Sequence, residues 1–233
     1  MIAIGFRVKS GYAIAVALRG PASAPTAVAC RIVELSDPAS PETRQPYHDG
    51  FFKQQNDPRE LARRVTIVNR CAKTSVAALL KDDCFAGASC TGAGLVVGSL
   101  IDPKTVGSPH IRAHASEGQL FRSALAGALG PHGIACDVIV EKTLAKEAVK
   151  ALRRPDAGIK RTVAAIGKTL GGRWRAEEKA ACTAAWMALS DQGRRSGSVG
   201  PGRGRLVTNP REPPATAPCR ARRRPRPSPG CSA

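Results

Sequence analysis

Residues 2–18 read IAIGFRVKSGYAIAVAL, two apolar runs on either side of a short basic turn. Each run is almost entirely apolar at its centre, as expected for a strand that is covered on both faces. Lys9, Ser10 and Gly11 supply the turn of a β-hairpin. Residues 27–35 form a third apolar run, so the chain is predicted to open with a three-stranded antiparallel meander.

Helical and strand patterns alternate after a long polar loop at residues 36–56. Asp57 is predicted to cap the first helix, with Pro58 in its first position and Glu60 completing a capping box. The remaining pattern predicts helices at residues 57–81, 108–129, 142–152, 159–170 and 177–189, and strands at residues 94–101 and 134–140. A meander followed by β-α units predicts an α/β fold with a mixed five-stranded sheet and helices on both faces.

The formal net charge of +18 is unevenly spread along the 233 residues. From residue 193 onward, ten arginines and one glutamate carry +9, which leaves +9 for residues 1–192. Residues 193–233 are rich in Arg, Pro and Gly and poor in large apolar side chains, so they are predicted to form a disordered basic tail. This tail is either a tether for nucleic acid or another acidic surface, or an extension without function.

The sequence carries no sign of export or of a membrane span. No basic region precedes the first strand, and no apolar run reaches about eighteen residues. The eight cysteines are scattered without a C-x-x-C pair. We therefore expect reduced thiols and a cytoplasmic protein without a membrane segment.

Three motifs besides the hairpin resemble one known family. They are LVVG at residues 95–98, VIVEKTL at residues 138–144 and KAACTAAWMAL at residues 179–189. In this order they resemble the RuvC/YqgF type of the ribonuclease H-like superfamily, which includes Holliday junction resolvases. The resemblance covers about residues 2–190 and implies a ribonuclease H-like domain at residues 1–192.

In such enzymes, carboxylates from separate strands and from the last helix hold divalent ions that activate water at a phosphodiester. The resemblance matches Glu141 with the family glutamate, Gly5 with the first aspartate and Ala181 with the last one. Glu178 lies three residues before Ala181, on nearly the same helical face. Glu141 and Glu178 are therefore the predicted catalytic residues and the predicted ligands of Mg²⁺, an ion that needs only one or two protein carboxylates.

The resemblance implies action on structured DNA or RNA as a Mg²⁺-dependent endonuclease. Because glycine binds no metal, Gly5 implies that this activity is weakened or lost. The alternative is a non-catalytic module that binds nucleic acid or protein and keeps only the fold. Few aromatic residues are present, so contacts are expected with the phosphate backbone rather than with stacked bases. The predicted contact residues are Arg7, Lys9, Lys160, Arg161, Lys168 and Arg173.

His110 and His114 are four residues apart on a predicted helix and can share one face. Two histidines in this spacing occur in metal sites. The sequence places no third ligand beside them, so they are predicted to be surface residues.

Overall fold

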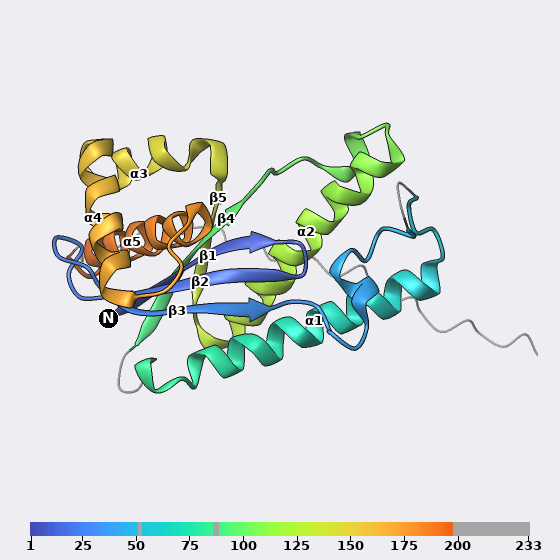
Figure 1. Cartoon of the computed structure of the whole chain (residues 1–233), viewed down its shortest axis with the longest axis horizontal. Coiled ribbons are helices and arrows are strands. Elements are labelled where there is room, and N and C mark those ends of the chain that lie inside the picture. The colour runs from blue at the N-terminus through green and yellow to red at the C-terminus, as the bar shows by residue number, and fades with distance from the viewer. Residues whose placement is uncertain (51–52, 86–88, 198–233) are drawn as a thin grey trace, which may run out of the picture. The chain divides into compact units, whose positions relative to one another are not determined.

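The computed structural model of the protein describes residues 1–50, 53–85 and 89–197. The strands are β1 Ile2–Lys9, β2 Tyr12–Arg19, β3 Thr26–Glu34, β4 Cys90–Val97 and β5 Ala135–Val140. They form one sheet in the order β3-β2-β1-β4-β5 (Figure 1). The first three strands are antiparallel neighbours, whereas β4 runs parallel to both β1 and β5. This topology confirms the predicted ribonuclease H-like α/β fold.

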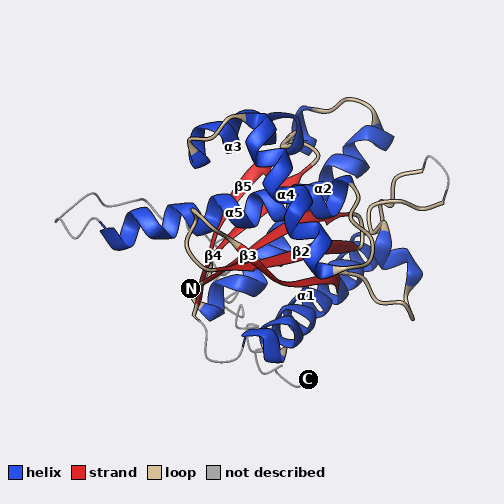
Figure 2. Cartoon of the chain, turned by 60° about the vertical axis from the view of Figure 1, so that its left-hand side comes forward, coloured by secondary structure: helices blue, strands red, loops and turns tan. Residues whose placement is uncertain are grey.

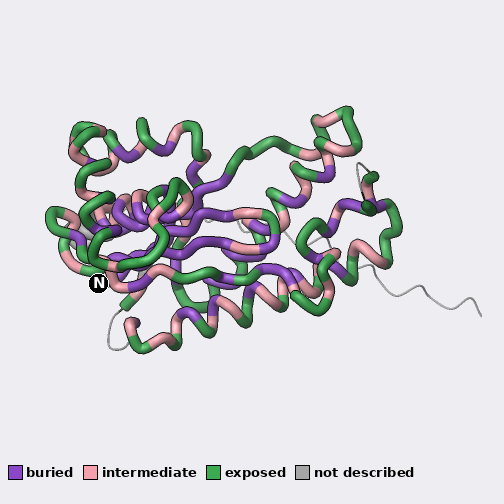
Figure 3. Tube along the Cα trace, in the orientation of Figure 1, coloured by how far each residue is buried: buried purple, intermediate pink, exposed green. Residues whose placement is uncertain are grey.

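Helices cover both faces of the sheet (Figure 2). They are α1 Pro58–Leu80, α2 Pro109–Leu129, α3 Leu144–Leu152, α4 Asp156–Leu170 and α5 Ala176–Gly197. Alternate residues of a strand point to opposite faces. Ile4 and Phe6 of β1 accordingly pack in one core with α1 and α2, while Val16 and Leu18 of β2 pack in another with α4 and α5. Figure 3 shows the central strand β1 and its neighbour β2 buried along most of their length.

The N-terminus of α1 matches the prediction only in part. The Asp57 side chain accepts hydrogen bonds from the backbone amides of Arg59 and Glu60, as a cap should. The predicted capping box is wrong, because the Glu60 carboxylate pairs with the guanidinium groups of Arg63 and Arg64 instead.

The fourth strand lies earlier in the chain than predicted. It spans Cys90–Val97, not residues 94–101. Leu100 and Ile101 are half exposed in the loop that follows, so their apolar character does not reflect burial in the sheet.

Two glycines allow α5 to lie directly on the sheet. Gly5 of β1 and Gly94 of β4 are paired neighbours. A Cβ at Gly5 would overlap the backbone of Ala181 and Ala185, and one at Gly94 would lie 2.9 Å from the Cβ of Ala184. The small-residue face of α5 therefore fits a surface without side chains on β1 and β4.

The helix α5 continues to Gly197, past the predicted domain boundary at residue 192. The rest of the predicted tail, residues 198–233, lies outside the described residues. None of the helices in the described ranges is long and apolar enough to span a bilayer. The six cysteines in these ranges are free thiols.

Candidate functional site

The site implied by the resemblance lies where β1 and β5 end beneath the first turns of α5. Ala3 and Gly5 face α5, and the alternation of the strand puts Arg7 on the same face, nearer the carboxyl end of β1. Glu141 follows β5 directly, in a short 3₁₀ turn before α3. The sheet therefore brings Arg7 and Glu141 together across 134 positions of sequence.

Arg7 is a buried cation whose main partner is Glu141. Its side chain is 7% exposed, and its guanidinium forms an ion pair with the Glu141 carboxylate, which is 47% exposed. The same guanidinium donates to the backbone oxygens of Val8 and Val96, at 3.0 and 3.4 Å. A buried guanidinium needs a counter-ion, and Glu141 supplies it.

The two glutamates at the start of α5 also have partners. Glu177 forms an ion pair with Lys9 at 3.0 Å. Glu178 accepts a hydrogen bond at 2.7 Å from the backbone amide of Arg175, the residue before the helix. This bond is the backward half of a capping box, and it satisfies a donor that the helix leaves free.

Glu141 and Glu178 face different hollows of the surface. Glu141 lines one between α3, α4 and α5, whereas Glu178 lines one over β2 and β3. The pKa of Cys30 on β3 is raised by burial and, second, by the negative charge of Glu178. Glu178 is therefore directed toward β3.

This arrangement does not fit the Mg²⁺ site that the resemblance implies. Glu141, Glu177 and Glu178 are each engaged by a protein donor or cation, and a divalent ion would have to displace these partners. Neither Glu141 nor Glu178 belongs to a group of three potential ligands whose donor atoms lie within 4.8 Å of one another, as far as the described residues extend.

Position 5, which the resemblance matches with the first aspartate, lies directly against α5. No side chain fits at Gly5, since even a Cβ overlaps the α5 backbone. The residue of β1 that stands beside Glu141 is Arg7. The side chain of Ala181 is buried in the apolar core that α4 and α5 form with β2. A buried cation, Arg7, thus lies beside Glu141, the carboxylate that the resemblance predicts as a metal ligand.

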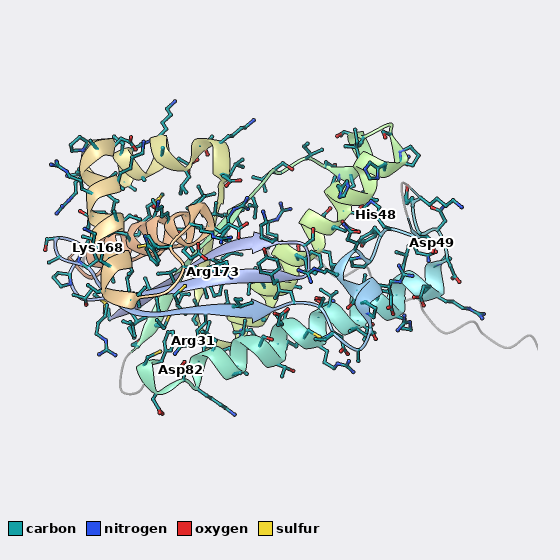
Figure 4. All side chains as sticks on the ribbon, viewed as in Figure 1. Arg31, His48, Asp49, Asp82, Lys168 and Arg173 are labelled. Atoms are coloured by element: carbon teal, nitrogen blue, oxygen red, sulfur yellow. The ribbon has the colours of Figure 1, made fainter. Side chains whose placement is uncertain are left out.

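The predicted phosphate-contacting residues separate into two groups. Arg7 is buried in its pair with Glu141, and Lys9 forms an ion pair with Glu177 of α5. The other four, Lys160, Arg161, Lys168 and Arg173, are exposed on α4 and on the loop that leads to α5. Figure 4 shows Lys168 beside α4 and Arg173 over the strands of the sheet, whereas His48 lies on the other side of the view, by α2.

One group of potential metal ligands does exist among the described residues, and it lies elsewhere. It consists of His48, His110 and His114. His114 is exposed and His110 is half-buried, in line with the predicted surface position, but the polar loop before α1 brings His48 to them as a third potential ligand that the sequence did not indicate. The repeat of His110, His114 and Glu117 along one face of α2 is the sequence signal that could have indicated this group.

Comparison with known proteins gives structural likenesses only. No protein-family model and no curated protein sequence matches the chain. Thermus thermophilus RuvC is 10% identical, with a TM-score of 0.47 over 84% of this chain and 97% of that one. The same protein in complex with a Holliday junction substrate gives 10% identity and a TM-score of 0.49, over 85% and 97% of the two chains. The yeast mitochondrial Holliday junction resolvase is 8% identical, with a TM-score of 0.44 over 83% of this chain and 80% of that one. At these values, the activity of this chain has to be argued from its own residues.

Proposed function

We propose that this protein binds structured nucleic acid through the phosphate backbone and does not cleave it by metal-dependent hydrolysis. The observation that carries the proposal is the excess of exposed lysines and arginines on α3, α4 and the start of α5, which we call the basic surface. Residues 142–179 contain eleven lysines and arginines and four acids, a formal net charge of +7, whereas residues 1–192 together carry +9. Most of the net positive charge of residues 1–192 thus lies in this one segment.

The charges of this segment are available to a ligand. Ten of the eleven basic side chains are exposed. Among the described residues, only Lys160 of this set forms an ion pair, with Asp156 at 2.7 Å. Unpaired lysines and arginines on one surface attract a polyanion and release its counter-ions on binding.

The absence of cleavage is proposed from the pairing of Arg7 with Glu141. A two-metal mechanism needs several carboxylates that are free to share divalent ions. Here the guanidinium of Arg7 forms an ion pair with the carboxylate of Glu141 at the end of β5. The fold would then serve as a scaffold for binding, which was the alternative left open by the sequence.

The binding proposal is tested with the full chain and a four-way DNA junction, over a series of salt concentrations. The triple variant Arg161→Ala, Lys168→Ala, Arg173→Ala removes three charges from the basic surface. Each lost phosphate contact reduces the slope of log K against log salt by about 0.9 on duplex DNA, so a reduction of roughly 2 to 3 is expected. Stem-loop RNA is measured in parallel.

The matched control removes three exposed charges from the opposite face of the sheet, in Arg59→Ala, Lys73→Ala, Lys81→Ala. This control should keep the wild-type slope. Equal slopes for both triple variants would contradict the proposed surface, because the loss would then reflect net charge alone.

Cleavage is assayed on the same substrates with Mg²⁺, Mn²⁺ or a chelator. The proposal expects intact substrate in all three. Metal-dependent cutting that disappears in Glu141→Gln would establish the nuclease and refute the non-catalytic part of the proposal, while leaving the binding surface to its own test.

A further inference from the structure

A buried acid in α2 points to a second site, independent of the proposed nucleic-acid surface. The side chain of Glu117 is 1% exposed, and its Oε1 lies 2.7 Å from Nδ1 of His48, which is 6% exposed. Its Oε2 has no hydrogen-bond partner among the described residues and lies 3.5 Å from Nδ1 of His114. A carboxylate in such a place requires positive charge close by.

Three imidazole rings meet beside this carboxylate. Nε2 of His48 lies 3.3 Å from Nδ1 of His110. The ring of His114 has its centre 4.5 Å from the centre of each of the other two. One nitrogen from each ring lies within 4.8 Å of the other two. Two ligands held at 2.0–2.1 Å by a tetrahedral zinc ion are about 3.4 Å apart, which the His48–His110 distance matches.

The surroundings hold the rings in place. His110, His114 and Glu117 share one face of α2, at intervals of four and three residues. His48 comes from the loop before α1, and the buried guanidinium of Arg64 donates to its carbonyl oxygen at 2.8 Å and to that of Pro46 at 3.2 Å. The loop position of His48 is therefore fixed from α1, and Figure 4 shows this residue beside α2.

We propose that His48, His110 and His114 bind a divalent transition-metal ion of the zinc class, with Glu117 as the residue that orients the ligands. With Nδ1 of His48 directed to Glu117, its Nε2 is directed to Nδ1 of His110, and an ion between these two nitrogens would replace their contact. Carboxylates that accept from the second nitrogen of a ligand histidine fix its tautomer and raise its basicity. Three imidazoles suit zinc or its transition-metal neighbours rather than Mg²⁺, which prefers oxygen ligands.

Three protein ligands leave the fourth tetrahedral position open to water or to another small ligand. The rings of His48, His110 and His114 line a hollow of about 690 Å³, together with Ser10 and Arg44. The ion would also tie the loop at residues 45–48 to α2. Metal binding should therefore stabilise the fold by mass action.

The test uses the untagged full chain, freed of metal and titrated with ZnCl₂. We expect one bound ion per chain by elemental analysis and a thermal midpoint that rises with zinc concentration. The variant His110→Ala, His114→Ala should lose both the bound ion and the thermal shift. His48→Ala is avoided because it would leave Glu117 buried without its partner.

The matched control is His132→Ala, since His132 is the fourth and last histidine of the chain and is exposed. It should bind zinc like the wild type. Glu117→Gln should retain the ligands but lower the affinity by about 10- to 100-fold, as loss of an orienting carboxylate does.

Co²⁺ distinguishes this site from the eight cysteines, because thiolate ligands give intense near-ultraviolet charge-transfer bands and imidazoles do not. A wild-type chain that binds neither Zn²⁺ nor Co²⁺ would overturn the proposal. So would binding that survives His110→Ala, His114→Ala or that shows thiolate bands. Stoichiometric binding without those bands, lost in the double variant and kept in His132→Ala, would support it.

Discussion

Adding a single methyl group at position 5 tests how the sheet and the candidate site are built. In Gly5→Ala, the new Cβ would overlap the carbonyl oxygen of Ala181 and the amide nitrogen of Ala185, and would lie 2.9 Å from the Ala181 carbonyl carbon. All three atoms belong to the backbone of α5. A side chain could rotate away from such a contact, but here the helix itself has to move.

The size of the effect follows from the required displacement. Ordinary Cβ contacts begin near 3.4 Å, so the 2.9 Å contact alone demands a shift of about 0.5 Å, and the overlapping atoms demand more. Overpacking of a core costs about 1–3 kcal/mol, or more where backbone must shift. One kcal/mol lowers the midpoint of a domain of this size by about 2–4 °C, so a loss of roughly 2–12 °C is expected.

The assay is thermal and urea unfolding followed by circular dichroism, with Gly98→Ala as the control. Gly98 follows β4, and a Cβ there has no heavy atom within 4 Å. The control should unfold close to the wild type. If Gly5→Ala were as stable as Gly98→Ala, α5 would not lie on β1 as described. The conclusion that position 5 cannot carry a metal-binding side chain would then fail with it.

Three further perturbations address the ion pair, the thiols and the loop. Glu141→Gln leaves the buried Arg7 without a counter-charge. Because Glu141 is half exposed, the expected loss in the free energy of unfolding, measured in urea, is about 1–2 kcal/mol, less than for a fully buried pair. Unchanged stability would contradict the pairing. Burial raises the pKa of Cys136 and Cys182 to about 12 and that of Cys90 to about 11, from 9.0. The unfolded chain therefore releases these protons first, so their stabilisation is complete below pH 9 and is lost as the pH rises from about 9 to 12. A urea series at pH 8 and pH 10 should show a decrease of about 1 kcal/mol for each thiol, and a smaller decrease in Cys182→Ala. Arg64→Ala removes the two hydrogen bonds that hold the backbone at Pro46 and His48, so limited proteolysis should cut within residues 45–50, where the wild type resists.

The elements of the fold follow closely from local patterns in the chain. The apolar runs around Gly11 are the strands β1 and β2, and the cap at Asp57 begins α1 where its side chain predicts. Such features depend on residues a few positions apart, so their physical cause can be read along the sequence. The end of β4 could not be read in this way, because Leu100 and Ile101 are apolar without being buried.

The packing around Gly5 is a feature that the local sequence does not indicate. In the hairpin alone, the glycine indicates only that a metal-binding side chain is missing at position 5. In the folded chain, the backbone of α5 packs directly against Gly5. Arg7, two residues further along the strand, lies at the candidate site. This difference depends on the helix that covers the strand, which begins more than 160 residues later.

The amino-acid order alone thus accounts for the strands other than β4, most helix boundaries, the basic segment at residues 142–179 and the α/β class. Tertiary packing alone accounts for the Arg7–Glu141 pair and for the meeting of His48 with the histidines of α2, contacts that span 134 and 62 positions. The reason is physical. Periodicity and capping are short-range properties of one segment, whereas charge compensation and ligand geometry arise only when distant segments are brought together by burial of their apolar faces.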